Sequence, residues 1–315
     1  MQWADRIGHR LKLRDLHIFI AVAQQGSMGK AARQLSVSQP VVSKAITDME
    51  HMLKVRLLDR TPTGAEPTLY GRALLKWGVV VFDDLRQSIK EIEFLADPTV
   101  GALRIGMASP MAAGLLPAVM DEISRQHPRI SFNVTELPMF VTQYRDLRER
   151  NVELIIGRMP TLIADEDIDA EILFHERLHI VAGLQSDWTR RRKIALAELV
   201  NEPWCLPPSN SIPSSLMADA FRSSGLEVPS ASVTCVSFQL FVSMLATGRY
   251  LSMFPSSVLH FAAKRCGIKA LPVRLDQQRP WPVAISTLKK RTISPVAELF
   301  IDCARTLAKP LTNAN

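Results

Sequence analysis

The sequence predicts an α+β segment of about seventy residues, one long helix, and then an α/β region that fills the rest of the 315-residue chain. Three observations support this order. Residues 26–50 read as two short helices joined by a tight turn, and residues 70–95 carry the apolar repeat of a single helix. Beyond a break at residues 97–101, strand-like and helix-like segments alternate, as they do in α/β proteins.

The second short helix has an apolar face and a polar face. At about 100° per residue, the apolar face collects Val42, Ala45, Ile46, Met49 and Leu53. The polar face collects Gln39, Ser43 and Thr47, with Lys44 beside them. A helix that buries the first face and lays the second in a major groove is the helix-turn-helix arrangement. An ordinary helical hairpin with a solvated polar face is the alternative.

The capping and contact residues of this segment fit its helices. Ser27 can cap the first helix, and Ser38 can cap the second, with Pro40 in the first turn, where no amide donor is needed. Gln39 and Ser43 can bond to base edges, and Lys44 can reach guanine acceptors or a phosphate.

A wing is predicted directly after these helices. Residues 55–60 and 66–69 read as two short strands around a turn at 61–65. Arg60, Thr61 and Thr63 would then meet the sugar-phosphate backbone or the minor groove. The alternative for Arg60 is a surface ion pair with Asp59.

The long helix, about Tyr70 to Leu95, carries apolar residues at alternating spacings of three and four. They are Leu75, Gly78, Phe82, Leu85, Ile89, Ile92 and Ala96. This spacing is typical of a helix that pairs with another helix, and Leu75, Phe82, Leu85, Ile89 and Ile92 are the predicted dimerisation residues. Packing against its own domain is the alternative, which we disfavour because the core of that small domain is already accounted for.

Composition separates the chain into a basic part and a nearly neutral part. Residues 1–76 hold twelve lysines and arginines against six acids, a net +6 of the total +7, so the remaining 239 residues carry +1. This asymmetry suits a DNA reader joined to a sensor. No apolar run is long enough for a membrane span and the start lacks a secretory signal, so we expect a cytoplasmic protein. Cys205, Cys235, Cys266 and Cys303 have no metal-ligand spacing, so no metal and no cofactor is expected.

The residues of the first seventy positions resemble the LysR-type transcriptional regulators. The matching positions are Leu16, Phe19, Gly26, Ser27, Ala31, Ala32, Leu35, Ser38 to Ser43, Ile46, Glu50, Leu53, Leu57, Leu58, Arg60 and Pro67 to Gly71. Leu58 stands where the family usually has phenylalanine, and Lys44 stands where arginine is common. The resemblance implies base contacts from Gln39, Pro40, Ser43 and Lys44, and a DNA contact from Arg60. Beside these, the residues predicted to contact DNA are Ser27, Lys30, Ser38, Thr47, Thr61 and Thr63.

The same resemblance implies a domain organisation. It comprises a winged helix-turn-helix at 1–69, a linker and dimerisation helix at 70–97, and an effector-binding domain at 98–315. The last would have a periplasmic-binding-protein-like (type 2) fold, with lobe one at 101–171 and 277–311 and lobe two at 172–276. The sequence predicts strands at 102–107, 130–136, 152–157, 178–183, 204–206, 250–254 and 282–288. It predicts helices at 115–126, 142–150, 213–223, 238–247 and 295–308, and the alternation favours parallel sheets.

Ligands of open α/β sheets bind at the carboxyl ends of strands. Reading those ends gives the predicted effector residues Ser109, Pro110, Met111, Leu137, Pro138, Arg158, Ser209, Ser211, Ile212, Ser237, Phe254 and Pro255. Hydroxyls and amides at helix starts suit an anion, and Arg158 suits a carboxylate. The alternatives are that Ser109, Ser209 and Ser211 are plain helix caps and that Arg158 pairs with Asp165 or Glu166. A small organic or aromatic acid is the expected effector, and a neutral sugar stays open.

These inferences favour a ligand-responsive transcription factor that is not an enzyme. Its partners would be double-stranded DNA with a pseudo-palindromic operator, a small-molecule effector, further copies of itself in a dimer of dimers, and RNA polymerase, but no membrane. A redox-responsive regulator and a ligand-independent architectural DNA binder are the alternatives. An enzyme is disfavoured because no G-x-S-x-G, Walker or H-E-x-x-H motif occurs.

Overall fold

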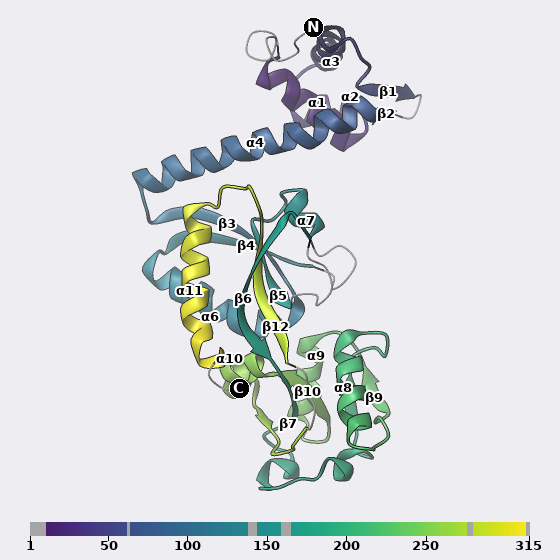
Figure 1. Cartoon of the computed structure of the whole chain (residues 1–315), viewed down its shortest axis with the longest axis vertical. Coiled ribbons are helices and arrows are strands. Elements are labelled where there is room, and N and C mark those ends of the chain that lie inside the picture. The colour runs from purple at the N-terminus through teal and green to yellow at the C-terminus, as the bar shows by residue number, and fades with distance from the viewer. Residues whose placement is uncertain (1–10, 62–63, 138–143, 159–164, 276–279, 313–315) are drawn as a thin grey trace. The chain divides into compact units, whose positions relative to one another are not determined.

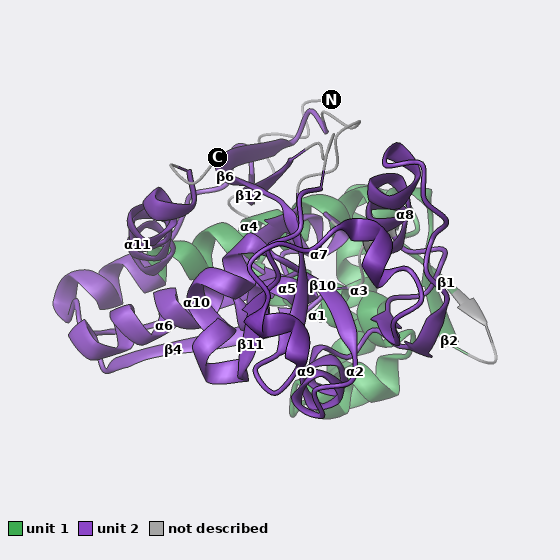
Figure 2. Ribbon diagram, turned by 90° about the horizontal axis from the view of Figure 1, so that it is seen from below, with its two compact units in different colours: residues 1–89 green, residues 90–315 purple. Residues whose placement is uncertain are grey.

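The computed structural model describes residues 11–61, 64–137, 144–158, 165–275 and 280–312. These residues belong to two compact units, residues 1–89 and residues 90–315, which Figure 2 distinguishes by colour.

The first unit has the predicted order of elements (Figure 1). They are α1 (Leu13–Gln25), α2 (Met28–Gln34), α3 (Gln39–Leu53), β1 (Leu58–Thr61), β2 (Gly64–Pro67) and the first part of α4 (Leu69–Ala96). The two strands form an antiparallel hairpin in which Thr61 pairs with Gly64. Thr61, Gly64 and Ala65, which were predicted to lie in the turn, therefore belong to the strands.

The apolar face of α3 is buried as its periodicity predicts. Val42, Ala45, Ile46 and Met49 are buried, and Leu53 packs at the edge of the same cluster. Phe19 and Val22 of α1 are fully buried opposite them. Burial of one continuous stripe leaves the other side of α3 to solvent, which is the condition for a recognition helix.

Two close backbone contacts fix the wing on this core. The amide of Ala65 donates to the carbonyl of Gly26 at 2.8 Å. Gly64 is needed beside it, because a Cβ atom there would lie 2.4 Å from the Gly26 oxygen. Glu50 of α3 also accepts hydrogen bonds from the amides of Leu57 (2.7 Å) and Leu58 (3.2 Å), which anchors the start of the hairpin.

The first part of α4 packs on this domain. Leu75 and Phe82 contact its core cluster, and Gly78 lies so close to Leu16 that a Cβ atom would be 3.0 Å from the leucine side chain. The expectation that the core is complete without the long helix is therefore wrong. Three of the seven positions that predicted pairing with a second helix, Leu75, Gly78 and Phe82, therefore pack within the same chain.

The second unit contains two five-stranded sheets, which form two lobes. Lobe one has the order β4-β3-β5-β12-β6, with β3 (Val100–Met107), β4 (Arg129–Glu136), β5 (Leu154–Arg158), β6 (Ile168–Glu176) and β12 (Trp281–Leu288). Its helices are α5 (Ser109–Ala113), α6 (Leu115–Gln126), α7 (Arg145–Arg148) and α11 (Pro295–Thr312). Side chains alternate across the central strand: Leu154 and Ile156 join the cluster under α6 and α11, whereas Ile155 joins the cluster of α7.

Lobe two has the order β11-β7-β10-β8-β9. Its strands are β7 (Leu178–Gly183), β8 (Trp204–Leu206), β9 (Ala231–Thr234), β10 (Leu251–Pro255) and β11 (Ile268–Ala270). Its helices are α8 (Ile212–Ser223), α9 (Phe238–Ala246) and α10 (Ser256–Cys266), with 3₁₀ turns η2 (Asp187–Arg190) and η3 (Leu196–Leu199). Trp204 and Leu206 pack in the cluster of α8, and Cys205 between them packs in the cluster of α9 and α10. Helices therefore cover both faces, as expected.

The sheets are mixed, so the expectation of parallel sheets is only partly right. In lobe one, β3 is parallel to β4 and β5, but β12 is antiparallel to β5 and β6. In lobe two, β7 is antiparallel to β10 and β11. Each of these antiparallel pairs includes a strand next to a crossing between the lobes. A chain that returns from the other lobe enters the sheet in the opposite direction.

Several boundaries differ from the sequence-based ones. β6 stays paired with β12 as far as Glu176, so the chain leaves the first sheet about five residues beyond the predicted lobe boundary at 171. The helix predicted at 142–150 is the single turn α7, and residues 142 and 143 lie outside the described residues. The short elements α5, β9, α10 and β11 were not predicted.

Candidate DNA interface and effector region

The polar face of α3 is open to solvent. Gln39, Pro40, Lys44 and Thr47 are exposed, and Ser43 between them is half-buried. The hydroxyl of Thr47 donates to the carbonyl of Ser43 at 2.9 Å, so Thr47 can offer only acceptor lone pairs to a ligand. These side chains come from a single helix, which explains why their proximity could be predicted from spacing alone.

The two helix caps behave differently. The hydroxyl of Ser27 accepts a hydrogen bond from the amide of Lys30 at 3.4 Å, as predicted for the cap of α2. Ser38 occupies the N-cap position of α3, but its side chain makes no capping hydrogen bond, contrary to expectation. Its exposed hydroxyl is therefore not engaged in capping α3.

The wing candidates are only partly described. Arg60 and Thr61 lie on β1, and Thr63 lies outside the described residues. Thr68 was not predicted as a structural residue. Its hydroxyl donates to the carbonyl of Arg56 at 2.7 Å and accepts from the amide of Gly71 at 3.0 Å, which joins the hairpin to the start of α4.

In lobe one, the predicted effector segments meet at one edge of the sheet. The carboxyl ends of the parallel strands β3, β4 and β5 lie there. Ser109 and Leu137 come after β3 and β4, and Arg158 is the last residue of β5. The amide of Ala108 donates to the carbonyl of Ile156 at 3.2 Å, which brings Ser109 beside the end of β5. Ser109 and Pro110 are half-buried, and Pro138 lies outside the described residues.

Arg158 has an aromatic neighbour that the sequence did not suggest. Its guanidinium lies over the ring of Trp281, 5.3 Å from the ring centroid. Burial lowers the pKa of Arg158 from its usual value, because a partly desolvated cation is less stable. Asp165, one of the two acids named as an alternative partner of Arg158, forms an ion pair with Arg148 at 3.0 Å.

Three predicted effector residues belong to the core. Met111 is 3% exposed, Leu137 is 8% exposed and Phe254 is 3% exposed, each inside a hydrophobic cluster. The structure therefore corrects their assignment to a ligand. Their positions at strand ends are as predicted, but their side chains pack into the core.

In lobe two, the remaining candidates begin helices. The hydroxyl of Ser211 accepts from the amide of Ser214 at 3.3 Å and caps α8, and the hydroxyl of Ser237 accepts from the amide of Leu240 at 3.3 Å and caps α9. Ser211 thus has the capping role that was its alternative, and Ser237 has the same role, which was not expected for it. Each hydroxyl can still donate to a ligand. Ser209 is exposed, Ile212 is the first residue of α8, and Pro255 is the half-buried last residue of β10.

α5 connects the two lobes. It follows β3 of lobe one, yet Ala113 at its end is buried in the cluster of α9 and α10. A Cβ atom on Gly114 would lie 3.0 Å from the hydroxyl of Ser257 at the start of α10. The segment that carries Ser109 therefore rests on lobe two.

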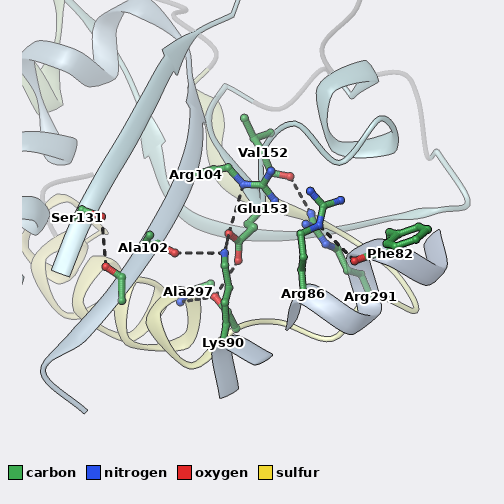
Figure 3. Close-up of polar contacts among 12 residues, drawn as sticks. Phe82, Arg86, Lys90, Ala102, Arg104, Ser131, Val152, Glu153, Arg291 and Ala297 are labelled. Carbon is green, nitrogen blue, oxygen red and sulfur yellow. Dashed lines mark hydrogen bonds and ion pairs between the residues drawn. The ribbon is translucent and has the colours of Figure 1, made fainter. Parts of the chain in front are cut away.

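A polar cluster around Glu153 lies at the opposite end of β5 (Figure 3). The Glu153 side chain is 3% exposed, and its carboxylate lies 2.5 Å from the ammonium of Lys90 and 3.7 Å from the guanidinium of Arg104. The hydroxyl of Ser294 donates to the same carboxylate at 2.8 Å. Lys90 is part of α4, so this cluster attaches the end of that helix to lobe one. In the sequence, this cluster is indicated only by an acidic residue directly before the apolar strand at 154–158.

The cysteines give little support to a redox role. Burial raises the pKa of Cys205 to about 11, with a smaller contribution from the neighbouring Cys235. Burial also raises the pKa of Cys303. A thiol with a raised pKa is protonated near neutral pH and reacts poorly with oxidants.

The described residues also bear on metal binding and on membrane insertion. No group of three or more histidine, cysteine or acidic side chains is arranged to hold a metal ion among these residues. None of the helices described here is both long enough and apolar enough to cross a membrane.

Two family descriptions together match most of the chain. "Bacterial regulatory helix-turn-helix protein, lysR family" matches residues 13–72, and "LysR substrate binding domain" matches residues 96–309. The chain belongs to the LysR family. It is a transcriptional regulator with an N-terminal DNA-binding domain and a C-terminal effector-binding domain, as the resemblance in its sequence implies.

Known members of the LysR family align with nearly the full length of this chain. The uncharacterized HTH-type regulator YdcI of Escherichia coli (strain K12) is 27% identical over 307 residues, covering 97% of this chain and 98% of YdcI. The regulator GbpR of Azospirillum brasilense is 27% identical over 299 residues, covering 94% of this chain and 86% of GbpR. A full-length OxyR variant from Pseudomonas aeruginosa has the same fold, with a TM-score of 0.62 at 22% identity over 96% of this chain and 98% of that one.

Proposed function

We propose that this LysR-family regulator reads its operator with the exposed face of α3. The observation that carries this proposal is the division of that helix into a buried apolar stripe and a solvent-exposed stripe with Gln39, Ser43 and Lys44. Gln39 and Ser43 have the donors and acceptors that base edges need, whereas Lys44 supplies a point charge that reaches a phosphate or a guanine. The wing residues Arg60, Thr61 and Thr63 are proposed to hold the adjacent backbone. Acting on chromosomal DNA, the protein would work in the cytoplasm.

Substitutions on α3 test this assignment. Gln39→Ala removes a base-edge contact, so we expect a loss of about 1–3 kcal/mol at one operator position and relaxed specificity there. Lys44→Ala, if Lys44 binds a phosphate, weakens binding to all sequences and lowers the salt slope by about one unit. Lys309→Ala removes the same charge from an exposed helix position in the other unit and is the matched control. Unchanged operator affinity in both α3 variants would refute the assignment.

We also propose that an exposed stripe of α4 pairs two copies of the chain. Trp77, Val81, Leu85, Ile89 and Ile92 are 63%, 42%, 41%, 55% and 66% exposed, which is unusual for large apolar side chains along one helix. The proposed pairing surface is therefore rotated from the predicted one: it keeps Leu85, Ile89 and Ile92, and it replaces Leu75 and Phe82 with Trp77 and Val81. A dimer would place two α3 helices on a pseudo-palindrome, and two dimers would make a tetramer.

The double variant Leu85→Glu, Ile92→Glu tests this pairing by sedimentation. Charges buried at a helix seam are costly, so we expect dissociation at concentrations at which the wild-type chain is associated. Arg72→Gln, at an exposed position on the opposite face of the same helix, should leave the mass unchanged. A wild-type chain that is monomeric, or a double variant that stays associated, would contradict the pairing surface.

We propose a small carboxylic acid as the effector, bound at the edge where Ser109 and Arg158 lie. The supporting geometry is the convergence of α5 and the end of β5, and the partly desolvated guanidinium of Arg158 over the ring of Trp281. Stacking occupies the face of the guanidinium, whereas a carboxylate bonds to its N–H edge. Calorimetric titration with a panel of organic and aromatic acids and of neutral sugars tests the class.

We expect Arg158→Ala to lose acid binding and Arg305→Ala, an exposed arginine in the same lobe, to retain it. If acids bind equally to the wild-type chain and to Arg158→Ala, the role of Arg158 is wrong. Binding of a sugar alone would replace the acid by a neutral effector.

A further inference from the structure

The first crossing between the lobes is unusually short. β6 of lobe one ends at Glu176 and β7 of lobe two begins at Leu178, so Arg177 is the only residue between two strands of different sheets. A change in the angle between the lobes must therefore be absorbed by a few backbone dihedrals near Arg177. Whatever restrains those dihedrals controls how freely the lobes move.

Hydrogen bonds join the first residue of α10 to both the carbonyl and the amide of Arg177 in this crossing. The amide of Ser256 donates to the carbonyl of Arg177 at 2.9 Å, and the amide of Arg177 donates to the hydroxyl of Ser256 at 3.2 Å. Pro255, the residue before α10, pairs with Leu178 in the second sheet. The crossing is thus tied to the first residue of a lobe-two helix.

Glu176 adds a buried carboxylate to the same point. It is 0% exposed, and one carboxylate oxygen accepts from the hydroxyl of Ser256 at 2.9 Å and from the amide of Ser257 at 2.8 Å. The other oxygen accepts from the hydroxyl of Ser257 at 2.7 Å. A carboxylate that accepts several hydrogen bonds at a helix start gains from the partial positive charge there. These bonds join the last residue of a lobe-one strand to the first turn of a lobe-two helix.

We propose that Glu176 is a hinge clamp, a positioning residue that holds the angle between the two effector lobes. Its carboxylate fixes α10 to the end of β6, and Ser257 in turn supports Gly114 and the segment of α5 that carries Ser109. Loss of the clamp widens the range of angles between the lobes and so changes the affinity for an effector bound between them. The part of this inference that concerns the effector rests on the proposed function, and the clamp itself does not.

Hydrogen exchange of the full chain, without any effector, tests the clamp. In Glu176→Ala, the amides of Arg177, Ser256 and Ser257 should exchange about tenfold faster or more, because the acceptors that hold them are lost or freed to move. The amides of β3 and β8 should exchange at the wild-type rate. Glu176→Gln should stay close to the wild type, because its amide oxygen can accept from Ser257 while its NH₂ group donates to the rotatable Ser257 hydroxyl.

Two further variants keep the test decisive. Glu171→Ala makes the same substitution at a 42%-exposed position of the same strand and should leave the hinge amides unchanged. Ser257→Ala removes only one donor and serves if Glu176→Ala does not fold; it should raise exchange at Arg177 and Ser256 in the same local pattern. Equal acceleration in β3, β8 and the hinge, or no acceleration at the hinge, would overturn the clamp.

Titration with benzoate, as a simple aromatic acid, then tests the link to the effector. We expect Kd to change severalfold in Glu176→Ala and in Ser257→Ala, and to stay unchanged in Glu171→Ala. Unchanged Kd in both hinge variants, despite faster exchange, would overturn the link. A wild-type chain that does not bind benzoate would count against an aromatic acid as the effector, and the exchange result would still decide the clamp.

Discussion

Two buried glutamates, Glu153 and Glu176, hold opposite ends of the first effector lobe by different means. Glu153 precedes β5 and faces the cations Lys90 and Arg104, as well as the hydroxyl of Ser294. Glu176 ends β6 and accepts from the hydroxyls of Ser256 and Ser257 and from the amide of Ser257. The first joins α4 to the lobe through ion pairs, and the second joins the two lobes through neutral donors.

The two glutamates differ in how the lost hydration of the buried charge is compensated. A buried charge loses its hydration, and either an opposite charge or several hydrogen bonds can compensate for it. At Glu176 the compensation is incomplete. Burial raises the pKa of its carboxyl above the usual value, although hydrogen bonds from Ser257 and Ser256 lower it again in part. Removal of the negative charge should therefore lower the free energy of unfolding much more at Glu153 than at Glu176.

The largest expected effect is that of Glu153→Gln. The amide keeps the shape of the side chain but leaves Lys90 and Arg104 without their buried counter-charge, so the free energy of unfolding should fall by about 3 kcal/mol. We place it at the low end of the range for broken buried pairs because the Lys90 and Arg104 side chains are still 26% and 29% exposed. Urea denaturation of the full chain measures it, and a loss smaller than that for Glu176→Gln would refute the contrast.

The next effect is that of Glu176→Ala. It leaves the buried donors of Ser256 and Ser257 without acceptors, which should cost about 1–3 kcal/mol in the free energy of unfolding. Denaturation followed by the same probe gives the value. If Glu176→Gln loses as much as Glu176→Ala, the charge itself stabilises this cluster, and the two glutamates are alike after all.

A smaller effect is expected in the pH dependence. Because the pKa of Glu176 is raised above its usual 4.5 in the folded chain, folding favours the protonated form. The stability that this contributes is complete below about pH 4.5 and is lost as the pH rises through the folded-state pKa. The wild type should therefore lose stability relative to Glu176→Gln as the pH rises from about 4.5 toward neutrality. Parallel denaturation series of the two proteins measure the difference, and a rise with pH would mean that the hydrogen bonds outweigh burial.

The smallest effect is that of Glu171→Gln. This carboxylate pairs with Arg305 at 2.6 Å, but the two side chains are 42% and 49% exposed. Arg305 lowers the pKa of Glu171, and water screens the pair, so we expect a loss of about 0.5 kcal/mol or less. A loss comparable to that of Glu153→Gln would show that burial is not what separates these glutamates.

Sequence reasoning succeeded where residues of one function share one helix. The faces of α3 could be read from spacing because a helix turns by a fixed angle per residue, and Val42, Ala45, Ile46 and Met49 are buried as predicted. It failed where orientation depends on neighbours from elsewhere in the chain. Met111, Leu137 and Phe254 follow or end strands as candidate ligand residues should, yet their side chains pack into the core. Position at a strand end does not say which way a side chain points.

The sequence by itself determined the family, the helix-turn-helix, the wing and the alternation of strands and helices, because each depends on local periodicity and turn residues. Only the tertiary structure decided which apolar residues of α4 pack against the DNA-binding domain and which remain exposed. It also decided that Glu176, Ser256 and Ser257 meet, although about eighty residues separate them in sequence. Such contacts are set by sheet order and by the crossing between lobes, and no local pattern of residues encodes them.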